Sequence, residues 1–227
     1  MDHYEHALTA MELLLDQVGE FHWRDWIRLD LAEWTAARSV QHHLSAYGGM
    51  GSLNDLIICS QNCHTVTPAQ EPWANCLFND LKSVCYHLAR HVDSGSPTDG
   101  LELAMGTLHK QLRGWRCLSC GYSEVTHLDL EWFIAGHRVR RGILEAIPAS
   151  QLDAFVRAML ALNAPELDGE RADLAKAASL SGIQITAREG WLRPCPACGG
   201  RDTAVYRWIR RNGEGPFTPA DENLPLR

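Results

Sequence analysis

Two short stretches that lie far apart in the sequence constrain this chain most. Each contains two cysteines that are separated by two residues and followed by a glycine: 117–121 and 195–199. The glycine permits a turn with positive φ, in which backbone N–H groups point at the sulfur atoms. Two such pairs supply the four thiolates of a closed tetrahedral Zn²⁺ site. We therefore predict one structural zinc ion, bound by Cys117, Cys120, Cys195 and Cys198.

The distance between the two pairs is unusual. Residues 121–194 lie between them, whereas about 15–20 residues are common for this pattern. The pattern resembles a Cys₄ zinc ribbon that carries a long helical insert. This resemblance implies a structural site, because four protein ligands leave no open position for a substrate.

The composition is that of a globular protein. The 227 residues are 45% hydrophobic and 22% charged, and both fractions are ordinary. No apolar run reaches the length of a membrane span, and five acidic residues among the first twenty are unlike a signal peptide. The eight cysteines are then expected to be reduced or metal-bound, as in the cytosol. We therefore expect a cytoplasmic protein without a membrane partner.

The charge is spread unevenly along the chain. Residues 1–110 contain 6 Lys/Arg and 14 Asp/Glu, and residues 111–227 contain 15 and 14. This asymmetry indicates two modules, and an acidic module attracts cationic partners while it repels nucleic acid. The acidic residues expected to contribute most to partner binding are Glu12, Asp16, Glu20, Asp25 and Glu33.

The predicted fold class is mainly α with small β elements, that is, α+β. An acidic helical module covers residues 1–94, and the polar stretch 93–100, which contains Gly and Pro, forms the boundary. The zinc-ribbon domain with its helical insert covers 100–211, and a loosely ordered tail covers 212–227. Apolar periodicity predicts helices over 3–18, 25–44, 71–91, 101–112 and 129–145, and from Pro148 and Pro165 onward. Strands are predicted over 56–59, 122–127, 183–186 and 203–209.

The stretch Tyr-Gly-Gly-Met-Gly-Ser-Leu-Asn-Asp at 47–55 is a glycine-rich turn. Asn54 and Asp55 are expected to brace it through hydrogen bonds from side chain to backbone. The stretch lacks the Gly-Lys-Ser/Thr ending of a phosphate loop. Together with its flanking Trp-rich helices it resembles a small bacterial domain of unknown function, over about residues 4–92. Some relatives of that domain are immunity-like, and the resemblance implies no catalytic residues.

The remaining cysteines and histidines offer weaker signals. Cys59, Cys76 and Cys85 lie in apolar or helical contexts and are expected to be buried. Adjacent Cys63 and His64 have the residue types of a nucleophile and its base. His87 and His91 lie four residues apart on one predicted helix, which makes a second metal site conceivable, but the glutamate of a metalloprotease helix is absent.

The leading functional hypothesis is a non-enzymatic protein-binding module, an immunity-type inhibitor whose partner is a basic bacterial toxin domain. The first alternative is a nucleic-acid-binding regulator that uses the ribbon, since basic and aromatic residues alternate after the second cysteine pair. An enzyme of a kind without a recognisable motif is the second alternative. The residues that support the nucleic-acid alternative are Tyr206, Arg207, Trp208, Arg210 and Arg211.

Overall fold

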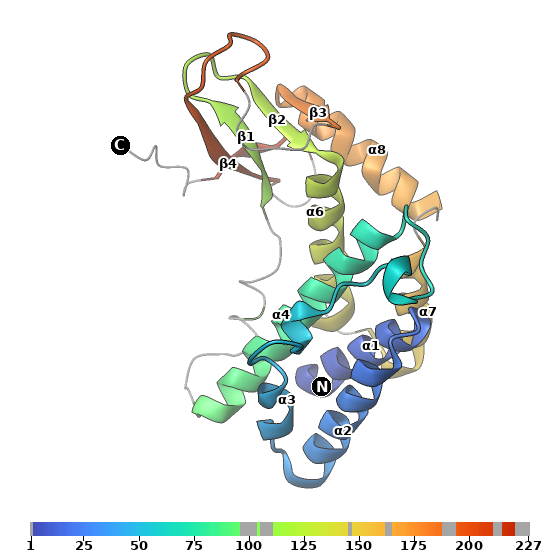
Figure 1. Cartoon of the computed structure of the whole chain (residues 1–227). Coiled ribbons are helices and arrows are strands. Elements are labelled where there is room, and N and C mark those ends of the chain that lie inside the picture. Colours follow the sequence, from blue (N-terminus) through green and yellow to red (C-terminus); the bar gives the residue numbers. More distant parts are fainter. Residues whose placement is uncertain are drawn as a thin grey trace. The chain divides into compact units, whose positions relative to one another are not determined.

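The computed structural model describes residues 2–95, 104, 111–144, 147–161, 165–187, 194–210 and 215–220. The chain divides into two compact units. Unit 1 comprises Met1–Leu108 and Ala135–Leu162, and unit 2 comprises His109–Ile134 and Asn163–Arg227. Figure 1 gives the path of the chain and the labels of the elements.

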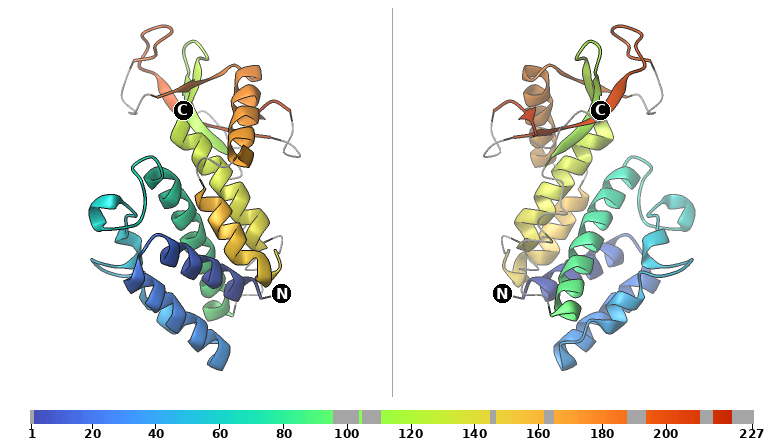
Figure 2. Two further views of the ribbon diagram at one scale, coloured as in Figure 1. Left: turned by 90° about the vertical axis from the view of Figure 1, so that its right-hand side faces the viewer. Right: turned by 90° about the vertical axis from the view of Figure 1, so that its left-hand side faces the viewer.

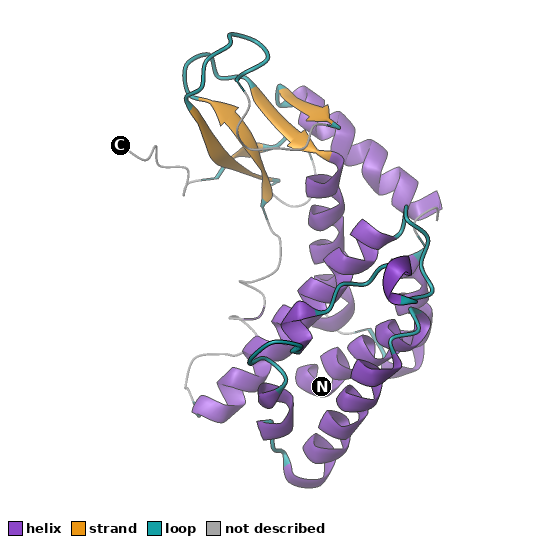
Figure 3. Ribbon diagram, viewed as in Figure 1, coloured by secondary structure: helices purple, strands orange, loops and turns teal. Residues whose placement is uncertain are grey.

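The predicted α+β class is confirmed. Figure 3 shows that the strands gather in one sheet, while the described residues up to Gly95 form helices and loops only. None of the helices in the described ranges has both the length and the apolar character that crossing a membrane requires.

Unit 1 is built from helices. The first helix, His3–Gln17, packs against the second, Phe21–Ala37, and against a long helix, Glu71–Ser94 (Figures 1 and 2). Apolar side chains from the first and the long helix are fully buried, among them Leu8, Leu14 and Trp73. The elements of unit 1 are α1 (His3–Gln17), α2 (Phe21–Ala37), α3 (Gln41–Ser45), two 3₁₀ turns (Leu53–Asp55 and Ser60–Asn62), α4 (Glu71–Ser94), a π-helical turn (Arg140–Leu144), a 3₁₀ turn (Ala149–Gln151) and α7 (Leu152–Leu160).

The compact units do not follow the predicted boundaries at 94 and 100. Part of the predicted insert belongs to unit 1, because α7 packs against both α1 and α4. The indole N–H of Trp73 donates to the carbonyl of Met159, and Val156 and Met159 are completely buried. Helix α7 therefore completes the hydrophobic core of unit 1, although nearly 60 residues separate it in sequence from α4.

The single helix predicted over 25–44 is in fact two helices. Helix α2 ends at Ala37, where Arg38 takes a left-handed conformation with φ of 52°, and α3 follows after a short turn. The buried carboxylate of Asp30 fixes this turn, since it accepts hydrogen bonds from His42 and from His43, the latter at 2.7 Å. A continuous helix could not make these hydrogen bonds. They therefore determine the local structure here, despite the helical periodicity of the sequence.

The predicted strand over 56–59 is absent from the structure. The segment is extended, but a side chain occupies the place of a neighbouring strand: Asn75 Oδ1 accepts from the Ile58 N–H at 2.9 Å, and Asn75 Nδ2 donates to the Ile58 carbonyl at 2.7 Å. Both backbone polar groups of buried Ile58 are thus satisfied without a sheet.

The predicted bracing of the glycine-rich turn is confirmed. The Asp55 carboxylate accepts from the backbone N–H of Ser52 at 3.1 Å, and the Asn54 side chain donates to the carbonyl of Tyr47 at 3.2 Å. Gly49 and Gly51 both have positive φ, which explains the glycines in this motif. The side chain of Met50 between them is fully exposed.

Unit 2 is a five-stranded sheet with helices. The strand order is β3-β2-β1-β4-β5, and all neighbours are antiparallel except β2 and β3, which are parallel. A parallel pair needs a long crossover connection, usually helical, and the predicted insert provides it. The elements are β1 (Leu112–Cys117), β2 (Ser123–Thr126), the first part of α6 (His127–Val139), whose residues from Ala135 onward belong to unit 1, α8 (Pro165–Leu180), β3 (Ile183–Thr186), β4 (Thr203–Ile209) and β5 (Thr218–Pro219).

The strands predicted at 122–127, 183–186 and 203–209 are confirmed by β2, β3 and β4. The helix predicted over 101–112 lies mainly outside the described residues, and Leu112 at its end belongs to β1. Part of the predicted loose tail is also ordered: β5 pairs with β4, and Phe217 and Ala220 are buried. The apolar ring of Phe217, whose centroid lies 5.6 Å from that of Phe133, explains why this segment packs.

One buried acidic side chain makes the stability of unit 1 depend on pH. Asp80 lies in α4 with only 4% of its surface exposed, and burial raises the pKa of its carboxyl to about 8. In the unfolded chain the same group ionises near its ordinary pKa of 3.8. Between pH 3.8 and about 8, folding is therefore accompanied by the uptake of one proton. The stability that this protonated carboxyl contributes is fully present below pH 3.8 and is lost as the pH rises toward 8.

We predict that Asp80→Asn becomes stabilising relative to the wild type as the pH is raised from 5 to 7. The difference in unfolding free energy should grow by about 1 kcal/mol per pH unit, because the amide needs no proton. Thermal unfolding at both pH values measures it, with Asp93→Asn near the exposed end of α4 as the matched control. An equal response of the two variants to pH would contradict the assignment.

Candidate metal centre

The two cysteine pairs lie in two turns of the same construction. Strand β1 ends at Cys117, and the second turn precedes β4. In the first turn the N–H of Cys117 donates to the carbonyl of Tyr122 and the N–H of Gly121 donates to Cys117, both at 2.8 Å. In the second, Cys195 donates to Gly200 at 2.7 Å and Gly199 donates to Cys195 at 2.8 Å. The φ angles of the two glycines, Gly121 and Gly199, are 77° and 73°, so the predicted positive-φ turns are confirmed.

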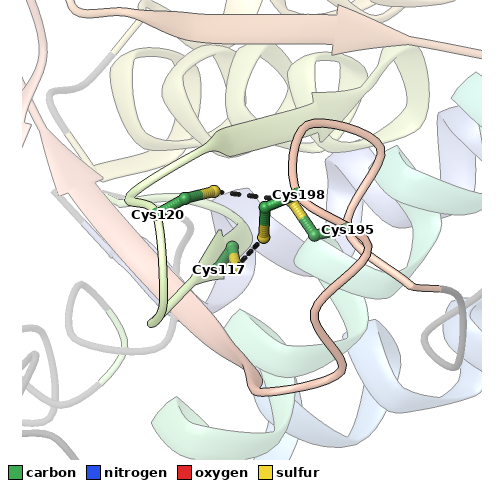
Figure 4. Close-up of side chains that lie close together, drawn as sticks. All are labelled: Cys117, Cys120, Cys195 and Cys198. Atoms are coloured by element: carbon green, nitrogen blue, oxygen red, sulfur yellow. Dashed lines mark hydrogen bonds between the residues drawn. The ribbon is translucent and has the colours of Figure 1, made fainter.

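The two turns bring their four sulfur atoms together (Figure 4). All four Sγ atoms lie within 4.8 Å of one another. Two of the contacts run between the turns, with 3.7 Å from Cys117 to Cys198 and 3.6 Å from Cys120 to Cys195. The backbone N–H of Leu118 also donates to the carbonyl of Asp202 at 2.9 Å. The site thus lies within unit 2, although its two cysteine pairs are 75 or more residues apart.

Backbone N–H groups donate hydrogen bonds to three of these thiols, those of Cys117, Cys120 and Cys198. Hydrogen bonds from the N–H groups of Cys120 and Ser119 lower the pKa of the Cys117 thiol to about 7. The N–H of Gly200 donates to Cys198 Sγ at 3.4 Å. For Cys120, the Tyr122 N–H lowers the pKa, but burial and the neighbouring thiols together raise it to about 12. Four thiols at this spacing therefore cannot all ionise without a cation to balance their charge.

The four cysteines could hold a metal ion, as the geometry and the donor set both indicate. Around a tetrahedral Zn²⁺ with Zn–S bonds of about 2.3 Å, neighbouring sulfurs lie about 3.8 Å apart. The two sulfur contacts between the turns, 3.6 and 3.7 Å, are near this value. In the described part of the chain, no other group of three or more His, Cys, Asp or Glu side chains could hold a metal ion. The second site considered around His87 and His91 is therefore not found there.

Cys63 and His64, which are adjacent in the sequence of unit 1, do not form a nucleophile and its base. His64 is buried, and both of its ring nitrogens are engaged: Nδ1 accepts from the N–H of Cys59 at 3.0 Å, and Nε2 lies 2.9 Å from Glu20 Oε2. Burial raises the pKa of Glu20, but the bonds from His64 and from the N–H of Trp23 outweigh it, so the pKa lies below its ordinary value. His64 therefore joins two loops of unit 1 and has no nitrogen left to activate a thiol.

The other cysteines behave as expected from sequence. Cys59, Cys76 and Cys85 are buried. Cys63 is exposed and has a positive φ of 65°.

Three of the five acidic residues predicted to bind a partner form one network of ion pairs with two arginines. Arg24 reaches Asp16 and Asp25, both at 2.8 Å, and Arg28 reaches Glu12 at 2.7 Å and Asp25 at 3.3 Å. The carboxylates of Asp16 and Asp25 remain about half exposed. These two are therefore accessible to a partner, although sequence reasoning did not find their arginine neighbours.

The other two acidic residues bind within unit 1. Glu20 contacts His64, as described above, and Glu33 accepts from the Ser39 hydroxyl at 2.6 Å and from the His42 N–H at 3.1 Å. Both carboxylates fix turns of unit 1 and contribute to its net charge, while their oxygens are committed to these internal bonds.

The structure also separates the basic and aromatic residues after the second cysteine pair. Trp208 is 3% exposed, and the guanidinium of Arg210 binds Asp173 at 2.7 Å. Arg116 covers the ring of Tyr206 at 4.9 Å. Arg211 lies outside the described residues. The alternating pattern of this strand therefore does not form one continuous basic and aromatic surface.

Comparison with known proteins reaches only the first unit. A family model described as a domain of unknown function (DUF6966) matches residues 16–67. This range contains the glycine-rich turn and the Glu20–His64 and Asp30–His43 contacts, but none of the four clustered cysteines. No curated protein and no solved structure matches the chain.

We predict that Cys117→Ser removes the bound metal and lowers the melting temperature by roughly 10 °C or more, because a structural zinc site contributes several kcal/mol to folding. Metal analysis and thermal unfolding of the purified protein measure both effects. Cys63→Ser makes the same chemical change at an exposed cysteine outside the cluster, so it should affect neither. A Cys117→Ser protein that melts with the wild type would contradict the structural role of this site.

Proposed function

We propose that this chain is a non-enzymatic protein-binding module of the cytoplasm, with a structural Zn²⁺ in unit 2 and an acidic docking surface on unit 1. Its partner is a basic protein domain, and its role is that of an immunity-type inhibitor of a bacterial toxin. The observation that carries this proposal is the division of charge between the units. Unit 1 contains 9 Lys/Arg and 16 Asp/Glu, whereas unit 2 contains 12 of each.

The four-cysteine cluster supports a structural rather than a catalytic metal. Soft thiolate ligands favour Zn²⁺ among the common metals of the cytosol, and four of them complete its tetrahedral shell. Such a site offers no open position to a substrate. The engagement of both His64 nitrogens removes the other candidate for catalysis. These points support a protein that acts by binding.

The net charge of unit 1 suits an encounter with a basic partner. A surplus of seven acidic residues creates a negative field that raises the association rate with a cationic domain and lowers it with nucleic acid. Toxins that act on nucleic acid need a basic cleft to hold phosphates. An acidic protein that covers such a cleft would block it, and this is the physical reason for the inhibitor role.

Asp16 and Asp25 are the residues of this surface that we expect to touch the partner. Their carboxylates are 49% and 61% exposed, and both already bind the guanidinium group of Arg24. Exposed ion pairs of this kind contribute little to stability. Exchanging an internal arginine for one on the partner would therefore cost unit 1 little free energy.

The test is stopped-flow association with a basic domain encoded beside this chain's gene. We predict that the association rate falls about tenfold between low and high salt, because screening removes the attraction. Asp25→Asn should slow association and also speed dissociation, whereas Glu33→Gln removes the same charge from an internally bonded position and should leave the dissociation rate unchanged.

An association rate that does not respond to salt would contradict the electrostatic part of the proposal. Equal dissociation rates for the Asp25→Asn and wild-type proteins would remove Asp25 from the contact surface. A gene neighbourhood without a basic toxin domain would count against the inhibitor role.

A further inference from the structure

The outward side of helix α2 carries apolar side chains where a surface helix usually carries polar ones. Phe21 and Leu29 lie eight residues apart, so they share one side of the helix, and they are 55% and 58% exposed. Ala32 and Ala36 continue this side toward the end of α2 and are exposed as well. Asp25 lies four residues from both Phe21 and Leu29, so one carboxylate stands within an apolar row. We call these five residues the α2 stripe.

The opposite side of α2 supplies the packing of this helix. Trp23, Ile27 and Trp34 lie on that side and are buried in unit 1. The α2 stripe adds little to folding, because apolar side chains stabilise a protein only when they leave water. Exposed apolar residues that stand in a row, unlike single ones, mark interaction sites. At about 1.5 Å per residue the stripe is about 22 Å long, which is enough for three turns of a partner helix.

An arginine of the chain itself shows which group this stripe accommodates. The Cζ atom of Arg24 lies 4.6 Å from the centroid of the Phe21 ring, and its Nε donates to Asp25 Oδ1 at 2.9 Å. One guanidinium group thus covers an aromatic ring of the stripe while it binds the carboxylate beside it. The planar guanidinium suits both contacts, whereas the compact, strongly hydrated ammonium of lysine stacks less well.

Asp25 retains a position for a second guanidinium group. Its side chain is 61% exposed, and the bonds from Arg24 and Arg28 all reach Oδ1. No residue that the structure describes donates a hydrogen bond to Asp25 Oδ2. Leu29, one turn further along α2, presents an apolar surface beside this oxygen's carboxylate. The methylene groups of an incoming arginine would pack on Leu29 while its charged end binds Asp25.

We propose that the α2 stripe is the docking surface for the basic partner, and that the partner places an arginine flanked by apolar side chains between Asp25 and Leu29. This inference rests on the proposed function, whose partner it specifies. Charge favours this occupant, because the carboxylates of Glu12, Asp16 and Asp25 outnumber the two arginines that they bind. A second copy of the chain fits less well. A two-fold axis midway between Phe21 and Leu29 would set the Asp25 carboxylates of the two copies against each other.

The experiment is an NMR titration of the full-length, zinc-loaded, ¹⁵N-labelled protein with a synthetic helical peptide. One face of this peptide carries leucine, arginine and leucine at four-residue spacing, and the peptide is added up to about 1 mM so that weak binding is detected. We expect a saturable shift of the backbone amide signals of residues 21–36. A peptide with lysine in place of the arginine should bind about fivefold more weakly, because its ammonium group stacks less well.

Substitutions in the protein separate the stripe from a general charge effect. Leu29→Ser should weaken binding of the arginine peptide about tenfold, since an apolar contact is lost. Asp25→Asn should also weaken it, and the effect of this substitution should shrink at high salt. Ile57→Ser makes a matched change at another apolar side chain of unit 1, which is 61% exposed and lies outside α2, and it should leave binding as it is. Equal melting temperatures of these variants exclude misfolding.

Four outcomes would overturn the proposal. The signals of residues 21–36 do not shift with 1 mM peptide, or the arginine and lysine peptides bind equally well, or Leu29→Ser binds like the wild type, or Ile57→Ser weakens binding as much as Leu29→Ser does. A wild-type protein that is a dimer in solution while Leu29→Ser is a monomer would assign the stripe to a second copy, and would also contradict the proposal. The proposed function is tested separately, by the salt dependence of association with the neighbouring basic domain, so failure of the peptide does not decide it.

Discussion

The order of unit 2 depends on the convergence of four sulfur atoms from two turns that lie far apart in sequence. The turn at Cys117 and the turn at Cys195 have the same backbone hydrogen bonds, and each ends in a glycine of positive φ. Bringing such distant segments together costs loop-closure entropy. A metal ion bound by both turns would offset this cost and would balance the charge of thiolates that otherwise cannot ionise together. Cys117 also pairs with Thr203 at the start of β4, so the register of these two strands is fixed beside the same site.

The chain between the two turns serves two purposes. Its ends belong to unit 2, where the parallel pairing of β2 and β3 demands a long crossover. Its middle, residues 135–162, belongs to unit 1, where α7 covers α1 and α4 and Met159 accepts a hydrogen bond from Trp73. The two units are therefore not consecutive along the sequence. Folding of unit 1 requires a segment that lies between the two cysteine pairs, so the segments of the two units are interleaved in the chain.

Sequence alone could predict the parts of this protein that depend on local chemistry. The cysteine turns, the brace formed by Asn54 and Asp55, and the burial of Cys59, Cys76 and Cys85 all follow from short patterns. The parts that depend on distant partners could not be predicted. Asn75 replaces a strand beside Ile58, Arg24 and Arg28 bind the acidic residues of α1 and α2, and Asp30 holds the turn before α3. The pairing of β1 with β4 became visible only in the structure, because no strand was predicted over 112–117 and Leu112 was expected to end a helix.

X-ray absorption at the zinc edge of the purified protein tests the central claim most directly, because it reports both the metal and its ligands. The account predicts about one zinc per chain, surrounded by four sulfur atoms at about 2.3 Å. A first shell that contains nitrogen or oxygen, or a sample purified with zinc present that holds no metal, would contradict it. Either result would mean that Cys117, Cys120, Cys195 and Cys198 do not form the closed site on which the order of unit 2 depends.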